Sequence, residues 1–425
     1  MSKLFADTAP LRNADFRRLW TSGIVTVIGA NLTVFAVPVQ IYALTQNSAY
    51  VGLSGLFALI PLVVFGLLGG AWADAMDRRL LLIIASCGLA VASALLWAQS
   101  ALALNNVWLV LILLGVQQIF FAINAPARSA AIPRMLPGEQ LAAANSLNMT
   151  VTQFGAIVGP LLAGLLLNWV DLSTLYLIDT VTTVAPIWAT FRLAPMPVLE
   201  SRDGSGQWGP AAVLDGFRYL AGNTVVLMSF VVDLIAMIAG MPRALFPQMA
   251  HQSFGGPVAG GTTMALLAAA MSAGAVAGGV FSGWLPRVRR QGLAVVVAIV
   301  LWGLSMVGFG LAAGAAHGRA GPLLWVALAF LALGGAADLV SAAFRSTMLQ
   351  EAASDDVRGR LQGVFVVVVG GGPRLADTAH GAAAAVVGTT AATAGGGALV
   401  VVGVLVAALA APAFIRYRAA QLAAD

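Results

Sequence analysis

The sequence predicts an all-α polytopic membrane protein with twelve transmembrane helices in two pseudo-symmetric six-helix bundles. Of its residues, 60% are hydrophobic and only 9% are charged, whereas a soluble protein carries about 25% charged residues. Long apolar stretches alternate with short polar ones, and the two halves of the chain carry similar features. A surface with so few charges must face lipid, and twelve spans of about 20–25 residues use nearly all of the chain.

The predicted spans follow the apolar stretches between Gly, Pro and charged residues. They cover residues 19–44, 50–73, 80–101, 107–127, 141–167, 172–192, 225–249, 262–285, 293–315, 322–344, 361–387 and 395–415.

Arginine placement predicts the orientation in the membrane. Arginines gather in alternate predicted loops, at 78–79, 287–290 and 358–360, and near both ends of the chain. The intervening loops 45–50, 103–106, 168–173 and 388–394 carry almost none, and Arg243 and Arg319 are the exceptions near the outer ends. The positive-inside rule therefore predicts a multi-pass protein of the inner membrane with both termini in the cytoplasm.

The widest polar break divides the chain into a six-helix bundle at 1–193, a cytoplasmic linker at 194–223 and a second bundle at 224–425. The halves resemble copies of each other. Pro38 and Pro247 lie at matching places in the first and seventh spans, and Arg128-Ser129 matches Arg345-Ser346. Parallel repeats of this kind are typical of transporters, whose substrate site lies between the repeats.

Several classes of protein are disfavoured. Cys87 is the single cysteine, so we expect no intramolecular disulfide and no cysteine-based metal site. No nucleotide-binding loop or metalloprotease motif occurs, so we expect no enzyme activity, no cofactor, no metal site and no direct use of ATP. The net charge of +5 follows the cytoplasmic loops and does not indicate nucleic acid. The start of the chain is basic and runs into a full-length span, so no cleaved signal peptide is predicted.

Two motifs resemble the major facilitator superfamily. Between the second and third spans, Gly70, Asp74, Arg78 and Arg79 fit its loop signature, while Ala75 and Asp77 depart from it. In the fifth span, Gly155, Gly159, Pro160 and Gly164 resemble the superfamily's antiporter motif, with Ala163 replacing one glycine. The resemblance implies the major facilitator fold, alternating access and transport of a small molecule.

Several longer stretches are similar to the branch of enterobactin exporters, which also contains macrolide and multidrug exporters. They lie at 36–42, 126–147, 215–220 and 346–365. The resemblance implies efflux of a siderophore-like or amphipathic, drug-like molecule, and so siderophore export or multidrug resistance.

The motifs also have a physical interpretation. Asp74 lies near cytoplasmic helix ends, where it can pair with an arginine such as Arg78 or Arg79 in one access state; the alternative is a simple topology signal. Gly155 and Gly159 allow close helix contact, with or without a directional role, and Pro160 should bend the helix.

Polar residues on helical faces are the candidates to line a cavity. Gln117, Asn124 and Arg128 share one face of the fourth span, although Arg128 is close enough to the helix end to snorkel. Asn145 and Asn148 share a face of the fifth span, and Asn31 and Gln40 lie in the first.

Ionisable residues inside predicted spans are the strongest local signal. They are Asp179, Asp233, Asp338, Arg374, Asp377 and His380. An ionised group at mid-bilayer costs about 2.5–3.5 kcal/mol on insertion scales, so each needs a partner or a wet cavity. The spacing allows Arg374 to pair with Asp377. Asp338 and Arg345 share a face of the tenth span, with Arg345 near the membrane edge. Pro373, after three glycines, should break the eleventh helix beside this cluster.

A proton-coupled exporter needs a carboxyl group that takes up a proton, and removal from water favours its protonated form. Asp338 and Asp377 are the first candidates for proton coupling, followed by Asp233 and Asp179, and His380 is a candidate proton shuttle. The alternatives are a permanent ion pair for Asp377, a packing hydrogen bond for Asp179 and an ordinary hydrogen-bonded His380. The sequence therefore predicts a monomeric proton antiporter in the lipid bilayer. A nutrient importer of the same superfamily is the alternative, and a non-transporting receptor would need a soluble domain that the chain lacks.

Overall fold

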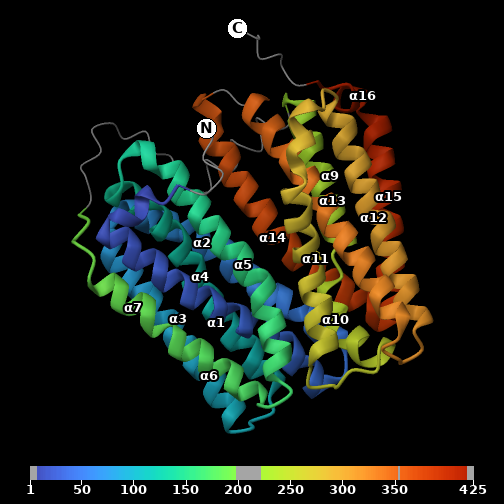
Figure 1. Cartoon of the computed structure of the whole chain (residues 1–425), viewed down its shortest axis with the longest axis horizontal. Coiled ribbons are helices and arrows are strands. Elements are labelled where there is room, and N and C mark those ends of the chain that lie inside the picture. Colours follow the sequence, from blue (N-terminus) through green and yellow to red (C-terminus); the bar gives the residue numbers. More distant parts are fainter. Residues whose placement is uncertain (1–6, 198–221, 353–354, 419–425) are drawn as a thin grey trace. The chain divides into compact units, whose positions relative to one another are not determined.

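The computed structural model describes residues 7–197, 222–352 and 355–418, which are helical with no strand among them (Figure 1). Their packing forms two compact units. The first comprises residues 1–45 and 57–209, and the second comprises residues 46–56 and 210–425. The helix that follows the first loop, α2 (Ser48–Ala75), therefore contributes its first turns to the second unit and its remaining turns to the first.

The first unit consists of packed long helices with short connections. In it, α1 packs against α5 and α6, and α3 packs against α4 and α6. Besides the later part of α2, its elements are η1 (Ala9–Arg12), α1 (Ala14–Thr45), α3 (Arg78–Ala101), α4 (Val107–Met135), η2 (Gly138–Gln140), α5 (Leu141–Leu166), α6 (Leu172–Thr182) and α7 (Val184–Phe191).

The second unit is built around α12 and α13. The helix α12 packs against α13 and α15, α13 packs against α11, and α9 packs against α14 and α15. Its elements are α9 (Thr224–Gly240), η3 (Arg243–Leu245), α10 (Phe246–Gln248), η4 (Met249–Ser253), α11 (Thr262–Val280), η5 (Ser282–Arg287), α12 (Gln291–Ala315), α13 (Pro322–Ala352), α14 (Asp355–Val387), α15 (Thr389–Ala410) and α16 (Pro412–Ile415).

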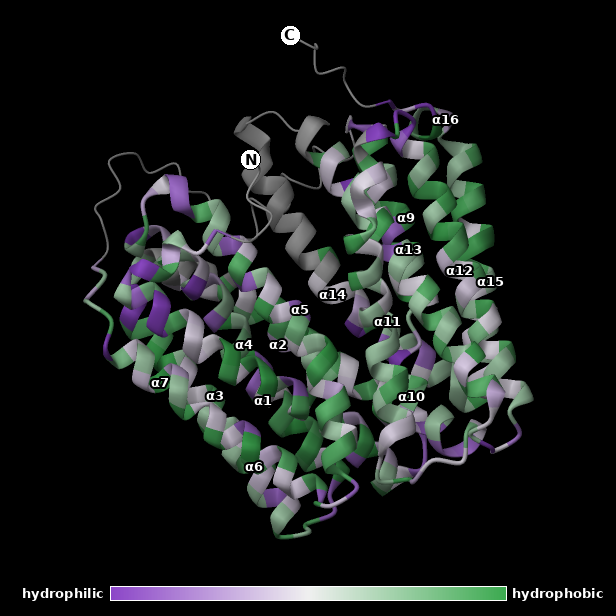
Figure 2. Cartoon of the chain, in the orientation of Figure 1, coloured by the Kyte–Doolittle hydropathy of each residue, from purple (hydrophilic) through white to green (hydrophobic). Residues whose placement is uncertain are grey.

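Ten segments of the described chain are long and apolar enough to cross a membrane. The other two predicted spans are present as helices that fail these criteria. One is divided between α6 and α7, and the other, α14, carries Arg374, Asp377 and His380. Hydrophobic residues follow the length of most helices and hydrophilic ones gather near the connections (Figure 2).

Two predicted spans are interrupted. The sixth is divided at Thr183, because Pro186 has no N–H to donate to the carbonyl one turn earlier. The seventh stops at Gly240, and the chain resumes as η3 at Arg243 after Met241 and Pro242. Proline again removes a donor, and glycine beside it lowers the cost of leaving the helix.

Two expectations near the end of the chain are wrong. Pro373 does not break the eleventh span, since α14 continues through it to Val387. One missing hydrogen bond is tolerated there because a helix satisfies every neighbouring backbone group in lipid. The predicted outer loop at 388–394 is also absent, because α15 begins at Thr389. Gly388, with φ +82°, turns the chain in a single residue.

Candidate functional site

A buried polar network surrounds Asp179 in the first unit. Its Oδ2 accepts hydrogen bonds from Thr33 of α1 at 2.7 Å and from Ser93 of α3 at 2.9 Å. Gln117 of α4 donates to the Ser93 hydroxyl at 3.1 Å. Asp179 is 1% exposed, and no arginine, lysine or histidine of the described chain forms an ion pair with it. The Asp179 carboxylate of α6 is thus held by hydroxyl groups of α1 and α3, and α4 joins the network through Ser93.

A second group of polar side chains connects three of the same helices. Gln40 and Gln99 exchange hydrogen bonds of 3.0 and 3.2 Å, and Tyr176 donates to Gln40 at 2.8 Å. Gln40 therefore bonds to neighbouring helices and does not face an open cavity. Sequence reasoning missed Thr33, Ser93, Gln99 and Tyr176, because hydroxyl groups are common in membrane helices. Gln99 alone interrupts an apolar run and was a visible signal.

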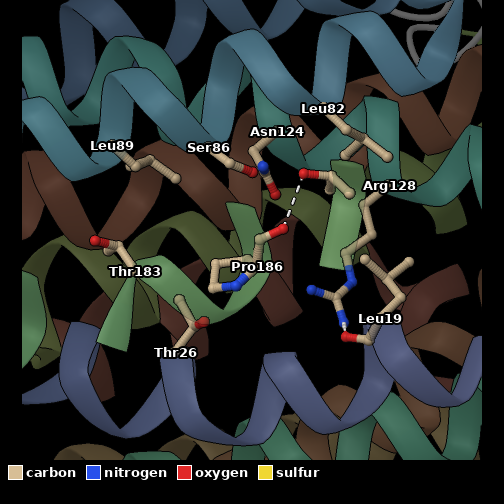
Figure 3. Close-up of a pocket in the computed structure, with 10 residues that line it drawn as sticks. Leu19, Thr26, Leu82, Ser86, Leu89, Asn124, Arg128, Thr183 and Pro186 are labelled. Carbon is tan, nitrogen blue, oxygen red and sulfur yellow. Dashed lines mark hydrogen bonds between the residues drawn. The ribbon is translucent and has the colours of Figure 1, made fainter. Parts of the chain in front are cut away.

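A small cavity of about 50 Å³ lies between helices of the first unit (Figure 3). Arg128 enters it from α4, and one guanidinium nitrogen donates to the Leu19 carbonyl of α1 at 3.1 Å. Asn124 lines the same cavity. The predicted stripe on the fourth span is therefore divided: Gln117 bonds to α3, whereas Asn124 and Arg128 line a cavity within this unit.

Asp338 and Arg345, which the spacing places on one face of α13, are not within ion-pair distance of each other. Arg345 of α13 is instead paired with Asp233 of α9, and its Nε donates to Ser341 at 3.1 Å. Asp233 is 1% exposed, and its second oxygen has no hydrogen-bond partner in the described chain. Asp338 is partly buried and interacts electrostatically with both members of the pair.

Asp377 lies close to the break in the seventh span. The break frees the first N–H groups of η3, and the Ala244 N–H donates to the Asp377 carboxylate. Its other oxygen, Oδ1, has no partner among the described residues. Arg374 and Arg243 interact with Asp377 electrostatically, but Arg374 is not within ion-pair distance, contrary to what the spacing allowed.

His380 is 3% exposed, and its ring interacts with the backbone of Ala239 in α9. It lies one turn after Asp377, so a buried histidine and a buried carboxylate share one helix.

Among the described residues of the second unit, buried and partly buried carboxylates outnumber the arginines that are buried to the same degree. Asp233 and Asp377 are buried and Asp338 is partly buried, and beside them Arg345 is buried and Arg374 is partly buried. The exposed Arg243 also interacts electrostatically with Asp338 and Asp377. Without Arg243, one proton on a carboxylate balances the charge of the group. Close packing against α2 positions Asp377. A Cβ added at Gly52 would lie 2.5 Å from the Asp377 carbonyl oxygen, and one added at Gly55 would lie 2.9 Å from the Asp377 Cβ.

The short loop between α2 and α3 is ordered by Asp77, which sequence reasoning treated only as a departure from the signature. Asp77 caps α3 by accepting from the Arg79 and Leu80 N–H groups, and it also accepts from Met196 N–H at 3.0 Å. Arg79 donates to the Phe191 carbonyl at the end of α7 at 2.7 Å. Two nitrogens of Arg78 have no described partner. Gly70 and Asp74 lie in α2, but the Asp74 side chain is outside what the structure describes.

The glycines of the fifth span form a close contact with α1. A Cβ at Gly155 would lie 2.2 Å from Val27 Cγ1, and one at Gly159 would lie 2.3 Å from Asn31 Cβ. Asn31 bonds to the Val27 carbonyl of its own helix at 2.7 Å. The other members of the motif, Pro160, Ala163 and Gly164, are also buried. By contrast, Asn145 is exposed and Asn148 is partly buried.

The family model described as transmembrane secretion effector matches residues 5–420. The chain belongs to this family of the major facilitator superfamily. As members of a transporter family, such chains are not enzymes, and this one is a multi-pass inner-membrane transporter.

Curated proteins similar to this chain include enterobactin exporters. The enterobactin exporter EntS of Citrobacter koseri is 27% identical over 359 residues, which cover 82% of this chain and 80% of that protein. EntS of Shigella boydii serotype 18 is 27% identical over 356 residues with the same coverage.

Solved structures with the same fold include the nucleoside transporter NupG, with a TM-score of 0.72, 14% identity and coverage of 95% of this chain and 98% of that one. A bacterial homologue of the lysosomal transporter Spinster has a TM-score of 0.71 and 14% identity, with coverage of 98% and 100%. These structural similarities show that this chain has the major facilitator fold.

Proposed function

We propose that this transporter is a proton-coupled exporter that moves a small organic molecule, siderophore-like or amphipathic, out of the cell by alternating access. The observation that carries the proposal is that, among the described residues, the buried and partly buried carboxylates Asp233, Asp338 and Asp377 outnumber the arginines buried to the same degree, Arg345 and Arg374. An ionised group in the membrane interior costs about 2.5–3.5 kcal/mol on insertion scales, so one proton is strongly favoured there when water is excluded.

In the proposed cycle, Asp233 holds Arg345, and the proton resides on Asp338 or Asp377. Opening toward the cytoplasm hydrates the cluster and releases the proton, since the charged form is stable in water. Opening to the outside lets the cluster take a proton up again, while substrate leaves. Both termini lie in the cytoplasm, and the monomer is the transporting unit.

The similarity to enterobactin exporters supports a siderophore-like substrate. Its identity is tested by comparing metabolites in the medium and inside cells, with and without the gene, under iron limitation. We expect one acidic, iron-chelating compound to be depleted outside and accumulated inside the deletion cells. Unchanged pools of such compounds would contradict this substrate class.

Coupling is tested in inside-out vesicles with the compound found in this way. We expect an imposed proton gradient to drive uptake and an uncoupler to stop it. Asp338→Asn and Asp377→Asn should each lower gradient-driven uptake at least tenfold while leaving downhill exchange intact. Asp171→Asn is the control, because Asp171 is exposed in the loop before α6. Normal gradient-driven uptake by both variants would contradict the role of these acids.

A further inference from the structure

The cavity of the first unit contains a positive charge that no residue described in the structure neutralises. Arg128 has no ion-pair partner in the described chain. Its only hydrogen bond with a described residue uses one guanidinium nitrogen, which donates to Leu19. A guanidinium has five N–H donors in a planar fork, so most of this fork is unused.

The surroundings are shaped to admit the guanidinium. Gly23 of α1 leaves the space, because a Cβ there would lie 2.6 Å from Arg128 Nη2. Figure 3 shows the guanidinium between Leu19 and Pro186, with the Nη atom that does not bond to Leu19 turned toward the middle of the cavity. Its contacts with Leu19 and Gly23 therefore hold the guanidinium at the cavity, beside α1.

The cavity also offers neutral polar groups beside the charge. Ser86 of α3, which is 2% exposed, and Asn124 line it, and neither side chain is hydrogen-bonded to another described residue. The volume of about 50 Å³ holds more than one water-sized group but not a whole organic molecule. A cation with a free fork, a hydroxyl and an amide in so small a space match the oxygens of a single oxyanion.

We propose that this cavity is an oxyanion subsite, in which Arg128 binds the carboxylate or similar acidic group of the transported molecule. The inference deepens the proposed function and rests on it, since it assigns an acidic group to the exported compound. An anionic lipid offers the same chemistry through its phosphate, so the test must separate the two sources.

The experiment measures thermal unfolding of the full-length protein, purified in an uncharged detergent, with benzoate or benzamide added. The two probes share a ring and differ in charge. We expect saturating benzoate to raise the midpoint by at least about 2 °C and benzamide to leave it unchanged. Arg128→Gln should abolish the benzoate shift, whereas Arg134→Gln, on the exposed end of the same helix, should keep it.

The stability of the unliganded variants separates binding from a structural role. Arg128→Gln should unfold at the same or a higher temperature than the original protein, because an unneutralised charge is removed. Gly23→Ala should weaken benzoate binding at least fivefold by displacing the guanidinium, and Gly66→Ala, whose Cβ meets nothing within 4 Å, is its control. A large loss of stability in Arg128→Gln together with a persisting benzoate shift would overturn the subsite.

Nanodiscs separate the two oxyanion sources. In phosphatidylcholine alone and in a mixture with phosphatidylglycerol, we expect equal benzoate shifts. An Arg128-dependent rise in stability with phosphatidylglycerol, together with loss of the benzoate shift, would overturn the assignment to the transported molecule. None of these measurements uses a proton gradient, so their failure would leave proton coupling standing, and failure of coupling in vesicles would leave the binding result standing.

Discussion

The pairing of Arg345 with Asp233 determines what happens when either charge is lost. Arg345→Gln leaves the Asp233 carboxylate buried without its cation, which we expect to destabilise the protein by about 3 kcal/mol. Removing both charges in Asp233→Asn/Arg345→Gln should recover more than half of that loss. Thermal unfolding monitored by tryptophan fluorescence checks this, because buried Trp302 contacts α9 through Ala236. Additive losses in the double variant would show that the pair is not coupled.

Asp179 differs from the acids of the second unit in what holds it. Both described donors, Thr33 and Ser93, bond to the same oxygen, Oδ2. An asparagine can present its carbonyl oxygen at that position, so Asp179→Asn should keep both hydrogen bonds. We expect this variant to retain at least half of the gradient-driven uptake in vesicles. A loss as large as that expected for Asp338→Asn would instead make Asp179 part of the proton path.

Among the elements, α11 and α13 form a close helix contact in which glycines of both helices take part. A Cβ at Gly274 would lie 1.9 Å from the Ala332 carbonyl oxygen, and one at Gly335 would lie 2.0 Å from that of Met271. Neither helix can accept a methyl group there without moving its backbone.

We therefore expect Gly274→Ala and Gly335→Ala each to lower the free energy of unfolding by about 1–3 kcal/mol. Gly279→Ala, on the same helix as Gly274, is the matched control, because its Cβ would meet only the Leu339 side chain at 3.7 Å. The midpoint of thermal unfolding checks the three variants. Equal midpoints for Gly274→Ala and Gly279→Ala would mean that the two helices separate readily.

At the scale of the whole molecule, most of what the sequence predicted follows from its composition and from the Gly, Pro and charged residues that separate the apolar stretches. The fold class follows from apolar stretches that only helices can satisfy in lipid. The ends of the helices were only partly predictable from the positions of proline. Pro242 interrupts the seventh span, whereas Pro373 is tolerated inside α14. Whether a proline breaks a helix depends on its neighbours in space, which spacing along the chain does not reveal.

The candidate site was predictable in its residue types but not in its pairings. Buried acids stand out in apolar spans because of their cost. Spacing on α13 placed Asp338 on the same face as Arg345, yet the partner of Arg345 comes from α9, more than a hundred residues earlier. The hydroxyl partners of Asp179 were likewise hidden, since nothing in sequence distinguishes Ser93 from other serines of membrane helices.

The predicted orientation of the whole chain is testable through its single cysteine. Cys87→Ser gives a background without thiols, into which Trp169→Cys or Arg289→Cys is introduced. Both positions are exposed, Trp169 between α5 and α6 and Arg289 before α12. Because the arginine-rich loops should remain in the cytoplasm, a membrane-impermeant maleimide should label Cys at 169 in intact cells. The thiol at 289 should react only after the membrane is permeabilised. The reverse labelling pattern would place both termini outside the cell. The orientation of the proton-binding cluster would then be opposite to the one that an exporter driven by the inward proton gradient needs.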